Sequence, residues 1–260
     1  MKLSIIVPFH RGKHFLEDCL ASIRDQGITD FETVLVLDHV TEDISEILEK
    51  YSDLNIKTVK LNKEEIKDRK FGSEEKARML KGYCGAAAAK NAGIDAAEGE
   101  YIYFLDSDDY ILNGTLPYLL KEAEEQQADF VYGRRNTTWN KRMVYLAYVE
   151  GHNDESNVIN NDEDKEEPEN YKKEKVEQEI ISQYPGLDRE RLRQMTEAYY
   201  NLLLSRKGFM NVTLTGVLVR RSFVESNGLR FNEKFIFFYD LGFMIRMLIM
   251  AKSFSMAEEA

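Results

Sequence analysis

The sequence lacks any apolar run of the length that crosses a membrane, which is about 20 residues for a helix. Its most apolar stretch near the end, "GFMIRMLIMA", is short and carries Arg246 in its middle. The apolar "LSIIVPF" at the start is too short for the core of a signal peptide and runs into His10 and Arg11. We therefore expect a cytoplasmic protein, and peripheral contact with the inner face of the cell membrane stays open.

Cysteine is scarce, since the chain has only Cys19 and Cys84, and the two form no CxxC pair. This pattern indicates neither a disulfide framework nor a zinc site, and a reducing environment is the default for it. The glycine-containing segment "GAAAAKNAG" is neither a GxGxxG fingerprint nor a P-loop. An active site must therefore be built from other residue types.

The chain also lacks the basic excess that nucleic-acid binding needs, because its formal net charge is −11 at pH 7. Most of this charge lies in residues 150–180, which hold 12 acidic residues and 4 lysines, a net −8, and leave −3 for the other 229 residues. Residues 150–169 contain few large apolar side chains and predict a mobile, solvated insertion. A contact with an acceptor or partner is the alternative.

Short apolar runs alternate with helical periodicities through the first 132 residues. We expect strands at residues 3–9, 31–38, 56–61, 101–105 and 129–133. Between them we expect helices at 13–26, 43–50, 85–99 and 115–127, the last capped by Thr115. Further along we expect a helix at 188–206, a strand at 211–220 and helices at 222–227 and 240–251. This alternation predicts an α/β fold with a mainly parallel sheet covered on both faces.

The segment "FLDSDD" places Asp106, Asp108 and Asp109 within four positions directly after a strand. Carboxylates this close repel one another unless water or a cation compensates them. In open α/β sheets the carboxyl ends of the strands are where ligands bind, and oxygen-only ligands suit Mg²⁺ or Mn²⁺. An acid-rich turn that caps the next helix explains the same residues equally well, so both interpretations stay open.

Three further features are compatible with a ligand site, and each has a structural explanation as well. Asp38 ends the second strand and could accept a hydrogen bond from a nucleobase or cap the next helix. Gly85 and the following alanines allow either a ligand or the sheet to approach closely, and Lys90 adds a positive charge. Asp240 begins an amphipathic helix, where it is either a cap or a base.

Taken in order, five segments resemble glycosyltransferase family 2, the inverting enzymes of the GT-A fold. They are "SIIVPFH", "VLVLD", "GAAAAKNAGIDAAEGEYIYFLDSDD", "TGVLVRRSFVESNGLRF" and "FYDLGFMIRML", and they span residues 3–252. The resemblance implies a Rossmann-like, mainly parallel sheet with a C-terminal acceptor-side subdomain. It divides one GT-A domain into a nucleotide-sugar-binding half, residues 1–132, and an acceptor-side half, residues 133–260, with the acidic insertion around 150–170.

The resemblance also implies which side chains contact the nucleotide or the donor sugar. These are Pro8, Phe9, His10, Asp38, Gly85, Lys90, Asp106 and Ser107. Within this set, Pro8 and Phe9 would pack on the nucleobase and Asp38 would accept the uracil N3–H.

The implied reaction is metal-dependent transfer of a hexosyl or N-acetylhexosaminyl group from a UDP-sugar, with inversion. Asp108 and Asp106 would hold Mn²⁺ or Mg²⁺, which neutralises the charge that develops on the leaving UDP. Asp240 would be the general base for the acceptor hydroxyl. The implied acceptor is a cell-surface polysaccharide, a teichoic acid or a lipid-linked glycan.

The chain departs from the family pattern at three positions near these residues. His39 replaces the second acid after the second strand, Tyr239 replaces the Glu before the base, and Lys90 stands where Arg is frequent. These differences keep open a second interpretation, a non-catalytic nucleotide-sugar-binding module fused to another transferase domain. A sugar nucleotidyltransferase is set aside, because it would open with a glycine-rich loop and "VPFHRGKHF" contains only Gly12.

The chain stops at "SFSMAEEA", where family members continue into a strand and a loop with a His or an acid near the metal. We therefore expect the N-terminal domain of a longer protein, with a possible C-terminal domain of the same protein as a partner.

Overall fold

A computed structural model describes residues 1–61, 84–133, 137–138, 158–159, 214–234 and 239–257, with scattered residues between 174 and 196. Its main sheet has seven strands in the order β3-β2-β1-β4-β8-β5-β9. They are β1 (Leu3–Phe9), β2 (Phe31–Leu37), β3 (Ile56–Lys60), β4 (Tyr101–Phe104), β5 (Phe130–Tyr132), β8 (Val217–Arg220) and β9 (Phe254–Met256). Only β8 runs antiparallel to its neighbours in this sheet, which confirms the predicted mainly parallel arrangement.

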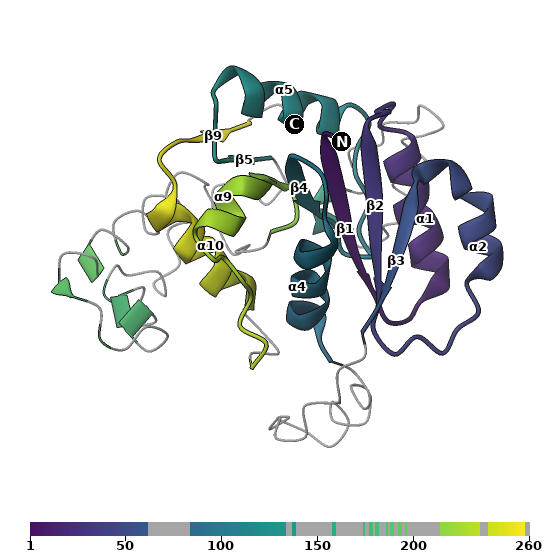
Figure 1. Cartoon of the computed structure of the whole chain (residues 1–260), viewed down its shortest axis with the longest axis horizontal. Coiled ribbons are helices and arrows are strands. Elements are labelled where there is room, and N and C mark those ends of the chain that lie inside the picture. The colour runs from purple at the N-terminus through teal and green to yellow at the C-terminus, as the bar shows by residue number, and fades with distance from the viewer. Residues whose placement is uncertain are drawn as a thin grey trace.

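Helices cover both faces of this sheet (Figure 1). They are α1 (Lys13–Arg24), α2 (Ser45–Lys50), α4 (Ala86–Ala96), α5 (Thr115–Glu125), α9 (Arg221–Ser226) and α10 (Tyr239–Met250), with a 3-10 turn, η1 (Ser52–Leu54). None of the helices in the described ranges is long and apolar enough to cross a bilayer.

The two faces of the sheet belong to two apolar cores. The first core joins α4, α9 and α10 to side chains such as Ile6 and Phe104, and the second joins α1 and α5 to side chains such as Ile5 and Tyr103. Successive residues of a strand point to opposite faces, so adjacent residues enter different cores. Because both faces are buried, the strand sequences read as continuous apolar runs and do not alternate with polar residues.

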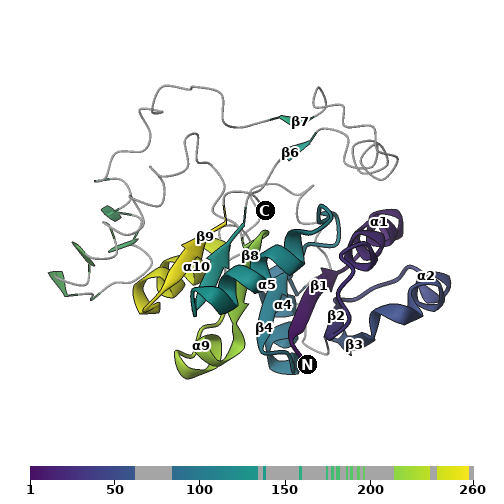
Figure 2. The same ribbon diagram turned by 90° about the horizontal axis from the view of Figure 1, so that it is seen from above.

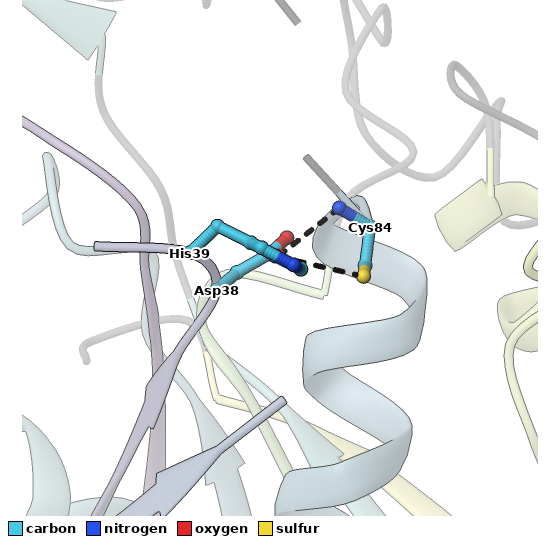
Figure 3. Close-up of side chains that lie close together, drawn as sticks. All are labelled: Asp38, His39 and Cys84. Carbon is cyan, nitrogen blue, oxygen red and sulfur yellow. Dashed lines mark hydrogen bonds and ion pairs between the residues drawn. The ribbon is translucent and has the colours of Figure 1, made fainter. Parts of the chain in front are cut away.

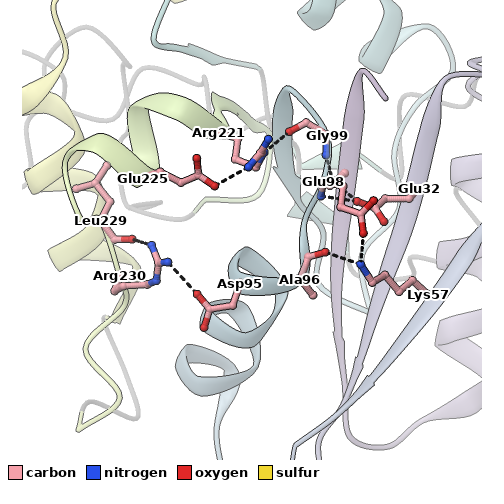
Figure 4. Close-up of polar contacts among 11 residues, drawn as sticks. Glu32, Lys57, Asp95, Ala96, Glu98, Gly99, Arg221, Glu225, Leu229 and Arg230 are labelled. Carbon is pink, nitrogen blue, oxygen red and sulfur yellow. Dashed lines mark hydrogen bonds and ion pairs between the residues drawn. The ribbon is translucent and has the colours of Figure 1, made fainter.

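The C-terminal end of α4 is tied to its neighbours by polar contacts (Figure 4). The Lys57 ammonium donates to the Ala96 carbonyl at 2.9 Å and pairs with Glu98 at 2.7 Å. On the other side, Arg230 pairs with Asp95 at 2.8 Å. These contacts connect the helix both to β3 and to the segment that follows α9.

Three sequence-based predictions need correction. Thr115 does not cap α5, because Gly114, with a φ of 80°, occupies the N-cap position and no side chain caps this helix. Residues 214–216 form a bend and a turn, so the strand expected at 211–220 begins at Val217. The strand β9 was missed, since three residues carry no periodic signal and its pairing with β5 comes from tertiary structure.

Parts of other predictions fall outside the described residues, namely most of the helix expected at 188–206 and most of the insertion at 150–169. Within that insertion, the structure places β7 (Val158–Ile159), which the sequence reading expected to be loop. It pairs with β6 (Thr137–Thr138) in a separate antiparallel sheet, which lies apart from the main sheet (Figure 2).

The contact between α4 and β1 depends on Gly93. A Cβ at this position would lie 2.3 Å from Cγ2 of Ile6, a distance that real Cβ atoms do not adopt. We expect Gly93→Ala to lower the free energy of unfolding by about 1–3 kcal/mol, through overpacking. Combined with Ile6→Ala, which removes the clashing atoms, the loss should be clearly smaller than the sum of the two single losses. Urea unfolding of the four proteins measures this coupling, and additive losses would contradict the proposed clash.

Candidate functional site

A pocket of about 300 Å³ opens at the carboxyl ends of β1, β2 and β4. It is lined by Pro8, Phe9, His10, Arg11, Asp38, Ala86, Ala89, Asp106, Ser107, Asp108 and Tyr239. The chain proceeds outward from β1 through β2 to β3 and then returns to the other side of β1 as β4. The pocket therefore lies at the point where the strand order reverses, which is the usual place for a ligand in an open α/β sheet.

Seven of the ten residues singled out in the sequence line this pocket. They are Pro8, Phe9, His10, Asp38, Asp106, Ser107 and Asp108. The other three lie behind the lining: Gly85 contacts Asp38, Lys90 contacts Asp106, and Asp240 contacts Lys90. The short side chains of Ala86 and Ala89 complete the wall, as expected if the start of α4 approaches a ligand closely.

The Lys90 ammonium is buried between two carboxylates. Its Nζ lies 3.2 Å from Asp106 and 3.4 Å from Asp240, and the side chain is 1% exposed. The rings of Tyr239 and Phe231 lie 5.0 and 5.8 Å from Nζ, within range of cation–π attraction. Thus one charge connects α4, the end of β4 and α10, and it supplies a cation to the acidic stretch "FLDSDD".

The pKa values of this cluster follow from burial and charge together. Burial by itself would lower the pKa of Lys90, but the charges of Asp106 and Asp240 outweigh it and hold this pKa above its usual value. Burial raises the pKa of Asp240, and the opposing Lys90 charge does not fully compensate it. Asp240 is therefore a carboxylate with a raised proton affinity, as a general base requires.

The acidic stretch forms a tight turn in which the Asp109 N–H donates to the Asp106 carbonyl at 2.9 Å. It does not cap the following helix, since α5 begins only at Thr115 and has no side-chain cap. Asp109 turns away from the pocket and accepts a bond from the Thr215 hydroxyl at 3.4 Å. Asp108 is exposed and lines the pocket.

Asp38 is held firmly at the end of β2. Its Oδ1 accepts bonds from the Cys84 N–H at 3.0 Å and from His39 Nδ1 at 2.9 Å, and its Oδ2 accepts from the Gly85 N–H at 2.9 Å. A carboxylate has about four acceptor positions, so these three contacts leave about one, on Oδ2. The Asp38 side chain is only 1% exposed, so a further hydrogen-bond donor can reach it only by entering the pocket.

His10 connects the ends of β1 and β2. Its Nδ1 lies 2.5 Å from the Asp38 carbonyl, and since a carbonyl only accepts, Nδ1 carries the proton and donates. The backbone reinforces the link, because the Asp38 N–H donates to the Phe9 carbonyl at 2.8 Å. The wall formed by Pro8 and Phe9 is thereby fixed relative to Asp38.

The donor set fits a hard divalent cation. Three carboxylates, those of Asp38, Asp106 and Asp108, line one pocket. Lys90 compensates Asp106, and N–H groups compensate Asp38. Asp108 is exposed to solvent at the pocket. Oxygen ligands of this kind suit Mg²⁺ or Mn²⁺.

Four lining residues were not predicted as site residues: the small Ala86 and Ala89, and the larger Arg11 and Tyr239. Arg11 follows the first strand directly and brings a positive charge to the pocket, so its position in "PFHR" was a usable signal. Tyr239 was noted only as a departure from the family pattern. Its neighbour Asp240 turns toward Lys90 while Tyr239 lines the pocket, and this division of roles depends on the orientation of α10.

Removing the Lys90 charge measures how much this buried cation contributes to the free energy of unfolding. We expect Lys90→Met to lower the free energy of unfolding by about 3–5 kcal/mol, because it leaves the buried Asp240 and the partly buried Asp106 without their cation. Without the Lys90 charge, the pKa of Asp240 in the folded protein would rise further. When a carboxyl has a higher pKa in the folded than in the unfolded protein, the folded protein loses stability as the pH rises through the folded pKa. Urea unfolding should therefore show a larger deficit at about pH 8 than at about pH 5.

A matched control is Lys57→Met, which removes an ammonium whose ion pair with Glu98 is largely exposed. It should cost no more than about 1 kcal/mol at either pH. Equal losses in the two variants would contradict the role assigned to Lys90.

Comparison with known proteins is consistent with this geometry. A family model described as "Glycosyl transferase family 2" matches residues 4–73 and 77–210, most of the chain. The chain is 34% identical over 131 residues to the "Uncharacterized glycosyltransferase EpsJ" of Bacillus subtilis, which is 50% of this chain and 32% of EpsJ. It is 33% identical over 132 residues to the poly(ribitol-phosphate) beta-N-acetylglucosaminyltransferase TarS of Staphylococcus aureus, which is 50% of this chain and 20% of TarS.

The chain therefore spans a third or less of the length of these two relatives. A solved structure of residues 1–349 of S. aureus TarS with UDP-GlcNAc superimposes with a TM-score of 0.63 at 20% identity, over 100% of this chain and 57% of that one. This likeness confirms the predicted α/β fold of the GT-A type. Together with the family match, it leads to one conclusion: the chain belongs to glycosyl transferase family 2.

Proposed function

We propose that the chain transfers a sugar from a UDP-sugar to an acceptor hydroxyl, with inversion at the anomeric carbon. One observation carries the proposal: a single pocket joins a wall at Phe9 and Asp38 to the carboxylates of Asp106 and Asp108. Directly behind it lies a buried carboxylate, Asp240, with a raised pKa. This is the set of groups that a metal-assisted, base-catalysed displacement needs.

In the proposed arrangement, residues 1–132 bind the nucleotide sugar and residues 133–260 contribute the acceptor side. Pro8 and Phe9 pack on the base, and the remaining acceptor position of Asp38 takes the uracil N3–H. Gly85 holds Asp38 in place through its N–H, and His10 holds the loop. These contacts favour a flat ring with one N–H donor at this end of the pocket.

Asp108, with Asp106, would hold a Mn²⁺ or Mg²⁺ ion, which when bound supplies positive charge to the diphosphate of the donor. A pocket lined by three carboxylates would otherwise repel a diphosphate. Arg11 and Ser107 line the same region and can donate to phosphate or sugar oxygens.

Asp240 would remove the proton from the acceptor hydroxyl as it attacks the anomeric carbon. The Lys90 charge favours the ionised form of this carboxylate and orients it, since Nζ lies 3.4 Å from Asp240 and is itself paired with Asp106. A single displacement inverts the configuration, so no nucleophilic side chain is required.

The names of relatives suggest the chemical class of donor and acceptor. Two of them are a poly(ribitol-phosphate) beta-glucosyltransferase and a poly(ribitol-phosphate) beta-N-acetylglucosaminyltransferase. We therefore propose a UDP-hexose or UDP-N-acetylhexosamine donor and a hydroxyl of a cell-surface glycan, teichoic acid or lipid-linked glycan. If the acceptor is lipid-linked, the protein would associate peripherally with the inner face of the cell membrane.

The metal site is tested by calorimetric titration of UDP with and without Mn²⁺. We expect Mn²⁺ to strengthen UDP binding in the wild type, and Asp108→Asn to weaken Mn²⁺-dependent binding by about tenfold or more, because a charged ligand is lost. Asp109→Asn is the matched control, since this neighbouring acid does not line the pocket, and its UDP affinity should match the wild type. Equal effects of the two substitutions would refute the assignment of the metal to Asp108.

The base is tested by UDP release from UDP-glucose and UDP-GlcNAc in the presence of glycan or polyol-phosphate acceptors. We expect Asp240→Asn to lower kcat by about 10²–10⁴-fold while the Kd for UDP stays unchanged, since the residue lies behind the nucleotide pocket. A non-catalytic binding module would instead bind UDP and show the same negligible turnover with and without the substitution.

A further inference from the structure

A second cluster of ligating atoms lies beside the pocket, where the end of β2 meets the start of α4 (Figure 3). His39 Nδ1 is 2.9 Å from Asp38 Oδ1 and 3.8 Å from Cys84 Sγ. All three ligand atoms lie within 4.8 Å of one another. A carboxylate, an imidazole and a thiol thus converge on one small volume.

The backbone holds these groups in place. Asp38 accepts N–H bonds from Cys84 and Gly85, so the segment that carries the thiol is anchored to the segment that carries the imidazole. His39 has a φ of 51°, in the left-handed region that residues other than glycine seldom adopt, and this turn brings its ring toward Cys84. Asp38 and Cys84 are almost fully buried, while the His39 side chain is 38% exposed and leaves a route from solvent.

The geometry does not suit a Cys-His-Asp catalytic triad. In a triad the carboxylate binds one ring nitrogen and the nucleophile faces the other. Here the same nitrogen, Nδ1, faces both the Asp38 carboxylate and the Cys84 sulfur. Three ligands that face a common point are instead the arrangement of a metal centre.

The separation between His39 Nδ1 and Cys84 Sγ agrees with a tetrahedral ion. Zinc bonds of about 2.0–2.1 Å to nitrogen and about 2.3 Å to sulfur place the two ligand atoms about 3.6 Å apart at a tetrahedral angle. The distance between Nδ1 and Sγ is 3.8 Å. Nδ1 and Asp38 Oδ1, now 2.9 Å apart in a hydrogen bond, would separate to about 3.4 Å when the ion replaces the proton between them.

We propose that Asp38 Oδ1, His39 Nδ1 and Cys84 Sγ form a binding site for Zn²⁺ or a chemically similar transition-metal ion, with a fourth position for water. Binding displaces the protons from Nδ1 and the thiol, because both groups ligate in their deprotonated form. The mixed oxygen, nitrogen and sulfur ligands distinguish this site from the all-oxygen carboxylates of Asp106 and Asp108, which suit Mg²⁺ or Mn²⁺. Asp38 lines the nucleotide pocket and is also one of these three ligands, so the two sites are neighbours.

The experiment is a titration of the full chain with Co²⁺, followed by absorption spectroscopy. We expect one equivalent to produce a thiolate-to-cobalt charge-transfer band in the near ultraviolet, and Zn²⁺ to displace it. Cys84→Ser should abolish the band, and His39→Ala should weaken Co²⁺ binding about tenfold or more. Circular dichroism checks that each variant is folded.

The matched control is Cys19→Ser, since Cys19 is the other buried cysteine and lies outside the cluster. It should retain the band, and so should Asp108→Asn, which alters the carboxylate site alone. Absence of the band in the wild type, its persistence in Cys84→Ser or its loss in Cys19→Ser would each overturn the proposal.

A second measurement needs no variant. X-ray absorption at the zinc edge of wild-type protein with one equivalent of Zn²⁺ should show one sulfur at about 2.3 Å and lighter ligands at about 2.0–2.2 Å. A shell of oxygen and nitrogen alone would overturn the assignment, because Cys84 would then not be a ligand.

Discussion

The ion-pair cluster of Lys90 with Asp106 and Asp240 is the interaction on which the rest of the site depends. A buried ammonium is costly unless it is compensated, and here two carboxylates from distant parts of the sequence compensate it. Lys90 and Asp240 are 150 positions apart. The cluster therefore fixes α10 against α4 and the end of β4, and it sets the proton affinity of the proposed base at the same time.

The remaining polar groups at the sheet edge are arranged by the same requirement, that buried polar atoms find partners. The Asp38 carboxylate accepts hydrogen bonds from the N–H groups of Cys84 and Gly85, directly before α4, and the Asp38 carbonyl accepts one from His10. These bonds leave few conformations open to the pocket wall. A nucleotide that enters would meet groups already in place, which lowers the entropy cost of binding.

The departures from the family pattern gather at this pocket. Tyr239 lines it and lies close to the Lys90 ammonium, while His39 turns toward Cys84 at its border. Their position next to the proposed nucleobase wall and the proposed base makes Tyr239 and His39 candidates for setting which donor or acceptor the chain accepts.

Apolar periodicity is a local signal, and it predicted the alternation of strands and helices and the mainly parallel sheet. Acids at strand ends pointed to Asp38, Asp106 and Asp108, while Pro8, Phe9, His10 and Ser107 were implied by the family resemblance. The burial of Lys90 between Asp106 and Asp240, the pairing of β9 and the contact of His39 with Cys84 became visible in the folded chain alone. Contacts between residues far apart in the chain depend on how helices and strands pack, and local patterns do not encode that packing.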